Sequence, residues 1–182
     1  MSEWAISGKM ASPMAETTNG AALTHPHLRA SLAVLEELYD DLVAFLLPLD
    51  EARLNWTPPP PETNSIAALV RHIVGSNTAW LARAVDEPFQ RERAAEFRSS
   101  DTADALVATV ELSRADARRR FALLDTVDPG TLRIVRRLDA TEDVEVSVEW
   151  CVAHALIHTG EHWGQLQLNA QLARAELDTP AP

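Results

Sequence analysis

The chain has little of what extracellular, membrane-spanning or nucleic-acid-binding proteins need. Its single cysteine, Cys151, excludes an intrachain disulfide and gives no sign of an oxidising compartment. No apolar run approaches the roughly 20 residues of a membrane span, and the N-terminus has no apolar signal core. The formal net charge of −11 disfavours nucleic acid and anionic membranes as partners. We therefore expect a cytoplasmic protein that acts on a small molecule.

Aromatic residues are also scarce, at 5% of the chain, whereas alanine and leucine are abundant and favour helix. Apolar residues recur at spacings of three and four in several stretches, which is typical of amphipathic helices. The first predicted helix runs from Pro26 to about Pro48, and prolines 58–61 then form a stiff, extended connector. The second helix begins near candidate N-caps at residues 63–65 and stops at Asp86.

A third helix is predicted after a charged, poorly periodic connection over residues 89–100. Asp101 or Thr102 can cap its N-terminus. Its arginines, Arg114 and Arg118–Arg120, most simply form a solvated face, and a basic clamp for an anionic substrate is the alternative.

The fourth helix follows a long connection in which residues 131–146 alternate weakly and predict a short hairpin or an extended crossover. It runs from about Ser147 to Leu177. Its expected apolar members are Trp150, Ile157, Leu166 and Leu168. The chain is therefore predicted to be all-α, with a flexible N-terminal tail over residues 1–24 and a four-helix bundle over residues 25–178.

Histidines are concentrated in the fourth helix, at His154, His158 and His162. A step of four residues advances only about 40° around a helix, so the three imidazoles share one face. Histidine is the commonest metal ligand, and we predict that His158 and His162 bind a metal ion with His72 of the second helix. Three protein ligands leave positions open for water or substrate, which is typical of a catalytic site. Core histidines satisfied by hydrogen bonds are the alternative.

Two more residues of the fourth helix are candidates for catalysis. His154 lies about 12 Å along the axis from His162, too far to share one ion, and we expect it to orient a ligand or to meet the substrate. Glu161 completes an H-x-x-E-H string found in a class of metallopeptidases, but those enzymes need a further carboxylate ligand well downstream. Only twenty residues follow His162, so we favour a role for Glu161 in binding a ligand ring or in proton transfer.

Two segments resemble the DinB-like superfamily. The first comprises Leu54-Asn55-Trp56, the prolines and the stretch from Asn64 to Ile73, and it resembles the exit of the first helix and the second helix of that family. The second, Trp150 followed by residues 154–166, resembles the last helix. The resemblance covers residues 25 to 175 and implies a four-helix bundle, a divalent metal held by His72, His158 and His162, and homodimers.

The resemblance also implies a class of activity. The better understood relatives are thiol-dependent maleylpyruvate isomerases and S-transferases that use mycothiol or bacillithiol. The expected function is therefore a metal-dependent S-transferase or isomerase in which a divalent ion, Zn or Ni first and Fe, Mn or Co otherwise, activates a low-molecular-weight thiol. A hydrolase that uses metal-activated water and a non-catalytic stress protein that binds metal or a small ligand are the alternatives. One departure is Asn77, near which many relatives carry a glutamate, because an amide cannot act as a base.

Overall fold

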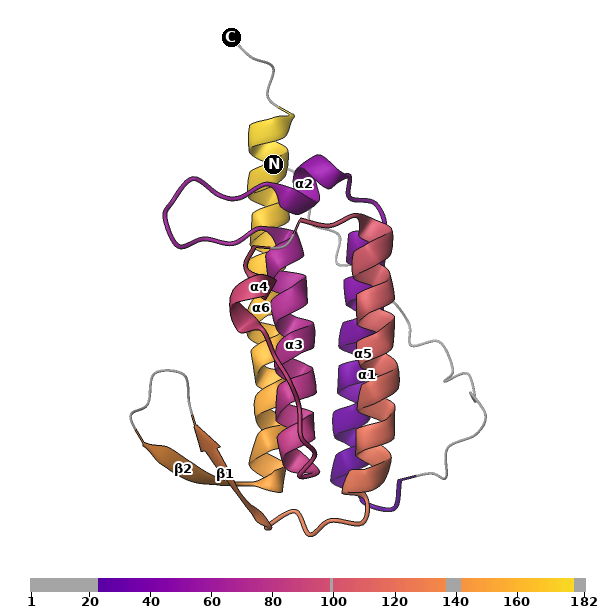
Figure 1. Ribbon diagram of the computed structural model, residues 1–182. Helices are drawn as coiled ribbons and strands as arrows, with labels where there is room; N and C mark the ends of the chain where they lie inside the picture. The colour runs from indigo at the N-terminus through magenta and orange to yellow at the C-terminus, as the bar shows by residue number, and fades with distance from the viewer. Residues whose placement is uncertain (1–22, 99, 137–141, 179–182) are drawn as a thin grey trace, which may run out of the picture.

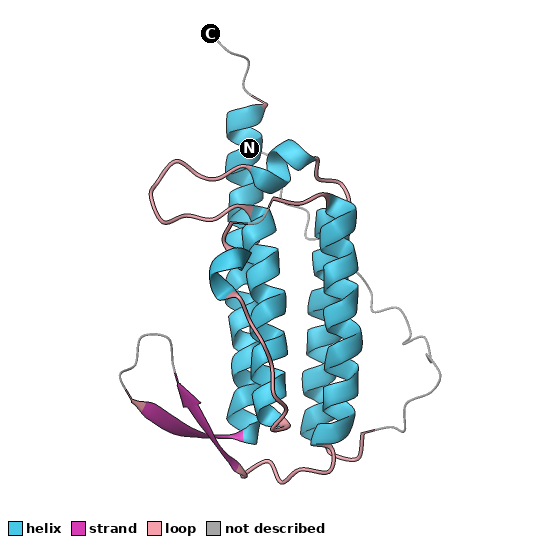
Figure 2. Ribbon diagram, viewed as in Figure 1, coloured by secondary structure: helices cyan, strands magenta, loops and turns pink. Residues whose placement is uncertain are grey.

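Four long helices dominate the computed structural model, which describes residues 23–98, 100–136 and 142–178 (Figures 1 and 2). They are α1 (Pro26–Leu46), α3 (Ile66–Ala84), α5 (Ala103–Leu124) and α6 (Val148–Leu177). Two short helices, α2 (Glu51–Asn55) and α4 (Arg93–Glu96), lie in the connections. The predicted all-α bundle is confirmed, whereas the N-terminal tail expected over residues 1–24 falls outside the described residues as far as residue 22.

The helices begin where the sequence supplies capping hydroxyls. The Ser65 side chain accepts a hydrogen bond from the backbone N–H of Ala68, and Thr102 accepts one from Ala105, both at 3.2 Å. Ser147 caps α6 in the same way. These bonds satisfy N–H groups that lack a partner within the helix, and they confirm Ser65 and Thr102 among the predicted caps.

The proline connector between α2 and α3 bends at residues 59–62 and does not run straight as expected. Glu62 adopts a left-handed backbone conformation with φ of 65°. The Thr63 hydroxyl lies 2.7 Å from the carbonyl oxygen of Pro58 and 2.8 Å from that of Pro60, so it can donate to either. The turn arises because prolines remove backbone donors and a side-chain hydroxyl takes their place.

The order of the helices requires one long crossover. In Figure 1, α1 and α6 run upward while α3 and α5 run downward. Both α1 and α3 pack against α5 and α6, so α1 and α3 lie on a diagonal of the bundle. Because α3 and α5 are parallel, the chain between them must return along the length of the bundle. This crossover places α4 against α3.

A two-stranded hairpin joins α5 to α6 at one end of the bundle (Figure 2). Strands β1 (Leu132–Arg136) and β2 (Asp143–Ser147) are antiparallel, with Leu132 opposite Ser147. The sequence left a short hairpin and an extended crossover open for residues 131–146, and the paired strands show the hairpin. Because β2 leads directly into α6, the hairpin sets the position at which the histidine-bearing helix begins.

The core contains apolar side chains from all four long helices, with Leu35, Ile73, Phe121 and Leu166 all at most 1% exposed. On α6, two predicted members are wrong: Ile157 is 61% and Leu168 54% exposed. Ile157 follows the buried Ala155 by two residues, a rotation of about 200° that places it on the opposite face. None of the described helices combines the length and hydrophobicity needed to cross a membrane.

Candidate metal centre

Three imidazoles from two helices meet on one side of the α3–α6 pair. His72 comes from the middle of α3, and His158 and His162 lie one turn apart on α6. The Nε2 atom of His158 lies 3.2 Å from Nε2 of His72 and 3.2 Å from Nε2 of His162. Two nitrogens bound to one tetrahedral ion at 2.0–2.1 Å would lie about 3.3 Å apart. This three-histidine group, whose ligand atoms all lie within 4.8 Å of one another, can therefore hold a metal ion.

Hydrogen bonds on the far side of two rings orient them toward the centre. Nδ1 of His72 lies 3.0 Å from Oε2 of Glu96, and Nδ1 of His162 lies 2.8 Å from Oε1 of Gln165. Carboxylate and amide oxygens only accept hydrogen bonds, so each Nδ1 must carry the proton. The Nε2 lone pairs of His72 and His162 then point into the space between the rings, as metal ligation requires.

His158 sits between the other two rings and is strongly disfavoured as a cation. Burial, followed by the proximity of His162 and His72, lowers the pKa of His158 to about 3. Burial also lowers the pKa of His162. The Nδ1 atom of His158 is buried and has no hydrogen-bond partner within the described part of the chain. A neutral His158 can turn its Nε2 lone pair toward a cation together with those of His72 and His162, so the donor set fits a metal ion.

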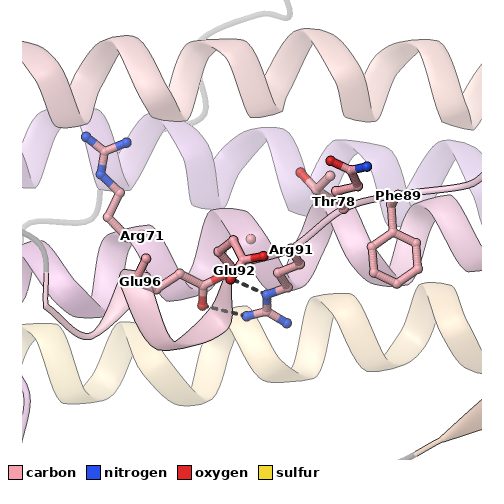
Figure 3. Close-up of a pocket in the computed structure, with 9 residues that line it drawn as sticks. Arg71, Thr78, Phe89, Arg91, Glu92 and Glu96 are labelled. Carbon is pink, nitrogen blue, oxygen red and sulfur yellow. Dashed lines mark hydrogen bonds and ion pairs between the residues drawn. The ribbon is translucent and has the colours of Figure 1, made fainter.

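Glu96 of α4 is a candidate functional residue that the sequence did not indicate. Arg91 donates to it twice, from Nε to Oε1 at 2.7 Å and from Nη2 to Oε2 at 2.8 Å (Figure 3). Burial raises the pKa of Glu96, but the hydrogen bonds from His72 and Arg91 outweigh burial and hold it below its ordinary range. Nη2 of Arg91 also lies 3.1 Å from Nδ1 of His72, which cannot accept while it donates to Glu96. A carboxylate fixed in this way keeps His72 in the ligating tautomer.

Gly75 allows Glu96 to come so close to α3. A Cβ atom at this position would lie 2.2 Å from Oε1 of Glu96, well inside van der Waals contact. The sequence offered little signal for this contact, because Glu96 lies in a charged connection without periodicity and Gly75 is one glycine within a helical pattern.

A cavity of about 390 Å³ lies on the outer side of α3, beside the Arg91–Glu96 pair (Figure 3). Its two arginines are already paired: Arg71 donates to Asp101 with Nε–Oδ2 at 2.9 Å, and Arg91 donates to Glu96. The cavity therefore presents no uncompensated cation from its lining residues.

The sequence profile of the DinB superfamily matches residues 34–166, well over half of the chain and a range that contains all three histidines. The chain belongs to the DinB superfamily. No match was found among curated proteins. Family membership and the three-histidine group together support a metal-binding DinB-superfamily protein.

The two predicted catalytic candidates of this DinB-superfamily protein occupy different surroundings. His154 lies outside the three-histidine group, stacked on Trp150 at 4.7 Å between ring centroids and edge-on to Trp80 at 4.4 Å. Glu161 is exposed, and its negative charge partly opposes the lowering of the His162 pKa that burial causes. The metallopeptidase interpretation requires a carboxylate ligand, and the three-histidine group contains none.

Asn77, near which many relatives were expected to carry a glutamate, belongs to a second polar cluster of this DinB-superfamily protein. Its Oδ1 accepts from the Thr159 hydroxyl at 3.0 Å, and its Nδ2 donates to the Tyr39 hydroxyl at 3.3 Å. Tyr39 in turn lies 2.9 Å from Oγ of Ser113. This four-residue network takes one buried residue from each long helix, and it gives Asn77 a structural role beside the metal centre.

The arginines of α5 correct part of another prediction. Arg118 and Arg119 are exposed, as expected of a solvated face. Arg114 and Arg120 are only 8% and 6% exposed, so they do not form a solvated face. Arg114 pairs with Glu36 and Asp40 of α1, and Arg120 pairs with Glu87 and Asp116. Since their charges are compensated by the chain's own carboxylates, these two residues do not form the alternative clamp for an anionic substrate either.

Proposed function

We propose that this protein binds a divalent ion through His72, His158 and His162 and catalyses a thiol-dependent group transfer or isomerisation on a small molecule. The observation that carries the proposal is the convergence of three imidazole nitrogens, two of them oriented by hydrogen bonds on their far side. When bound, the ion supplies Lewis acidity that lowers the pKa of a thiol toward neutrality. Zn and Ni suit imidazole ligands best here, with Fe, Mn and Co as further choices.

The protein's own residues orient and expose the site. Glu96 and Gln165 hold the Nδ1 protons of His72 and His162, so the ligand atoms need little reorganisation. Three protein ligands leave open positions for a thiol and a substrate, whereas a structural zinc site is closed by four.

Proton transfer is assigned to the two candidates that flank the ligands. His154, whose ring centroid lies 6.1 Å from that of His158, can contact a substrate that reaches the site. Glu161 lies on the exposed surface and is the weaker candidate. We expect Glu161→Gln to change the turnover rate by less than about threefold and His154→Gln to reduce it more than about tenfold, since general acid–base residues contribute 10²–10⁴. A steady-state rate assay of both variants checks this, and a larger loss in Glu161→Gln would reverse the assignment.

Metal analysis comes first among the tests. Protein purified without chelator is expected to contain about one divalent ion per chain, and the cobalt-substituted protein is expected to change its visible spectrum when a low-molecular-weight thiol is added. Absence of the ion would contradict metal binding, and absence of a spectral change would contradict thiol activation.

Two alternatives use the same three histidines. A hydrolase would turn over esters or amides without added thiol, and a non-catalytic binding protein would bind metal but transfer nothing. Assays with reactive electrophiles, with and without thiol, separate the three outcomes.

The proposal also includes a homodimeric state and a cytoplasmic location. The exposed α6 residues Ile157, Leu168 and Leu172, with Gly160 and Gly164 between them, form an apolar stripe suited to a second copy of this chain. Sedimentation of the wild type and of Leu168→Glu tests the homodimer. A reduced thiol as co-substrate fits the cytoplasm.

A further inference from the structure

A strip of aromatic rings leads away from the three-histidine group along α3 and α6. It starts at His158, whose ring centroid lies 6.1 Å from that of His154. His154 stacks on Trp150 with an interplanar angle of 10° and meets Trp80 edge-on. Trp80 and Trp150 contact each other at 5.4 Å between centroids. Because the rings of Trp80, Trp150 and His154 are only partly buried, the strip offers apolar contact to a bound molecule.

Arg83 lies at the far end of this strip and differs from the arginines of α5. Its guanidinium carbon lies 4.8 Å from the ring centroid of Trp80 and 4.4 Å from that of Phe89. No carboxylate within the described residues pairs with it. Burial is the main cause that lowers the pKa of Arg83. A half-buried cation without a counterion is unfavourable, so an anion that came to it would be stabilised.

The surroundings of Arg83 are locally positive in a chain whose formal net charge is −11. Arg133 of β1 donates from Nε to the backbone oxygens of Arg83 and Ala84, at 3.1 and 3.3 Å. Burial raises the pKa of the Cys151 thiol, and both Arg83 and Arg133 oppose that shift. Arg83 and Arg133 therefore both lie close to the buried Cys151 thiol. The hydrogen bonds of Arg133 go to carbonyl groups, which are uncharged and do not neutralise its positive charge.

We propose that Arg83, Trp80 and Trp150 form a subsite for the carboxylate end of a small molecule whose other end reaches the three-histidine group. A guanidinium donates two parallel hydrogen bonds to a carboxylate, and the indole rings contact the apolar body between the two ends. The subsite rests on the proposed function, because the other end of the molecule is taken to be the thiol or its partner substrate.

The spacing along the helices sets the length of that molecule. The guanidinium of Arg83 lies 4.8 Å from the Trp80 ring, so Trp80 marks its level along the bundle. Trp80 follows His72 by eight residues and Trp150 precedes His158 by eight, which corresponds to about 12 Å along each helix. A molecule that contacts both sites needs its two functional groups less than about 12 Å apart once the contact distances at both ends are subtracted. A six-carbon chain meets this requirement, whereas a two-carbon chain is too short.

The test compares two thiols of equal length on the cobalt-loaded protein. We expect 6-mercaptohexanoate to bind about tenfold tighter than the neutral 6-mercaptohexan-1-ol, as measured by titration of the cobalt absorption. Arg83→Gln is expected to abolish the difference and Arg83→Lys to retain part of it. Arg136→Gln, which removes the same charge from an exposed pair with Asp143, is the matched control and is expected to change neither affinity.

The outcomes separate the subsite from the proposed function. Equal affinities of the two thiols for the wild type, or a preference that survives in Arg83→Gln, overturn the subsite and leave thiol activation intact. If neither thiol changes the cobalt spectrum, thiol activation fails, and hexanoate and 1-hexanol are titrated instead by tryptophan fluorescence. A response to hexanoate alone that is lost in Arg83→Gln supports the subsite, and equal responses to both compounds overturn it.

Discussion

Two polar clusters lie next to each other in the bundle and are joined by consecutive residues of α6, His158 and Thr159. In the four-residue network, donors meet acceptors from Thr159 through Asn77 to Tyr39 and Ser113. In the three-histidine group, the central nitrogens face one another at 3.2 Å, and because His72 and His162 carry their protons on Nδ1, at most one of the three central nitrogens can donate. The two clusters share helices and neighbours but differ in how their hydrogen-bonding groups are matched.

This difference distinguishes a structural cluster from a binding site. A network whose members satisfy one another needs no ligand and contributes to the specificity of the fold. A group of three converging imidazole nitrogens has more lone pairs than protons at its centre, and a bound cation satisfies them. Disrupting the first cluster should therefore change stability, and disrupting the second should change metal binding.

The largest effect is expected from His158→Ala. This change removes the central ligand, so the affinity for Zn is expected to fall more than about 100-fold, since losing even an outer partner of a ligand costs 10–100-fold. Competition with a chromophoric chelator measures the affinity. His154→Ala is the control and is expected to retain the metal, and equal losses in both variants would contradict the assignment of ligands.

Asn77→Ala is expected to lower the stability of the fold and to leave the metal affinity unchanged. It removes the two buried hydrogen bonds of the Asn77 amide and creates a small cavity, while Thr159 keeps its bond to the Ala155 carbonyl and Tyr39 keeps Ser113. We therefore expect a loss of about 2–3 kcal/mol in the free energy of unfolding. Denaturant titration measures the stability, and the chelator assay should show unchanged Zn affinity. A large loss of metal with little change in stability would place Asn77 in the metal centre.

Gly75→Ala tests whether the glycine permits the Glu96–His72 hydrogen bond. The new methyl group would displace the carboxylate, so we expect the Zn affinity to fall about tenfold. Gly164→Ala is the matched control because a Cβ atom there has nothing within 4 Å, and it is expected to leave the affinity unchanged. If both variants bind Zn as the wild type does, Glu96 does not orient the site.

The smallest effect is expected from pH in the metal-free protein. Because the pKa of His158 is lowered from 6.5 to about 3, protonation favours the unfolded chain. The stability is therefore complete above pH 6.5 and falls as the pH decreases toward 3. Solvent screening at this partly exposed ring limits the loss to on the order of 1 kcal/mol between pH 7 and pH 5. Urea titration of the wild type and His158→Gln at both pH values measures it, and an equal loss in both would assign it to other groups.

Local patterns predicted much of the fold. The helices follow from the spacing of apolar residues, their N-termini from Ser65 and Thr102, and the hairpin from the weak alternation after Gly130. Exposed residues of α6 such as Ile157 were assigned to the core in error, because hydrophobicity alone does not tell which face of a helix meets its neighbours. The pairing of Arg114 was likewise beyond the sequence, since its partners lie on α1.

The sequence by itself determined that His158 and His162 share a helical face, because the helix repeat fixes the direction of residues four apart. It also determined the helix starts and the absence of a disulfide. Only the tertiary structure decided that Glu96 would reach His72 past Gly75, that Asn77 would join a network from all four long helices, and that Arg83 would lie beside Trp80. These contacts join residues distant in the chain, and helix packing and the crossover, which no local pattern encodes, bring them together.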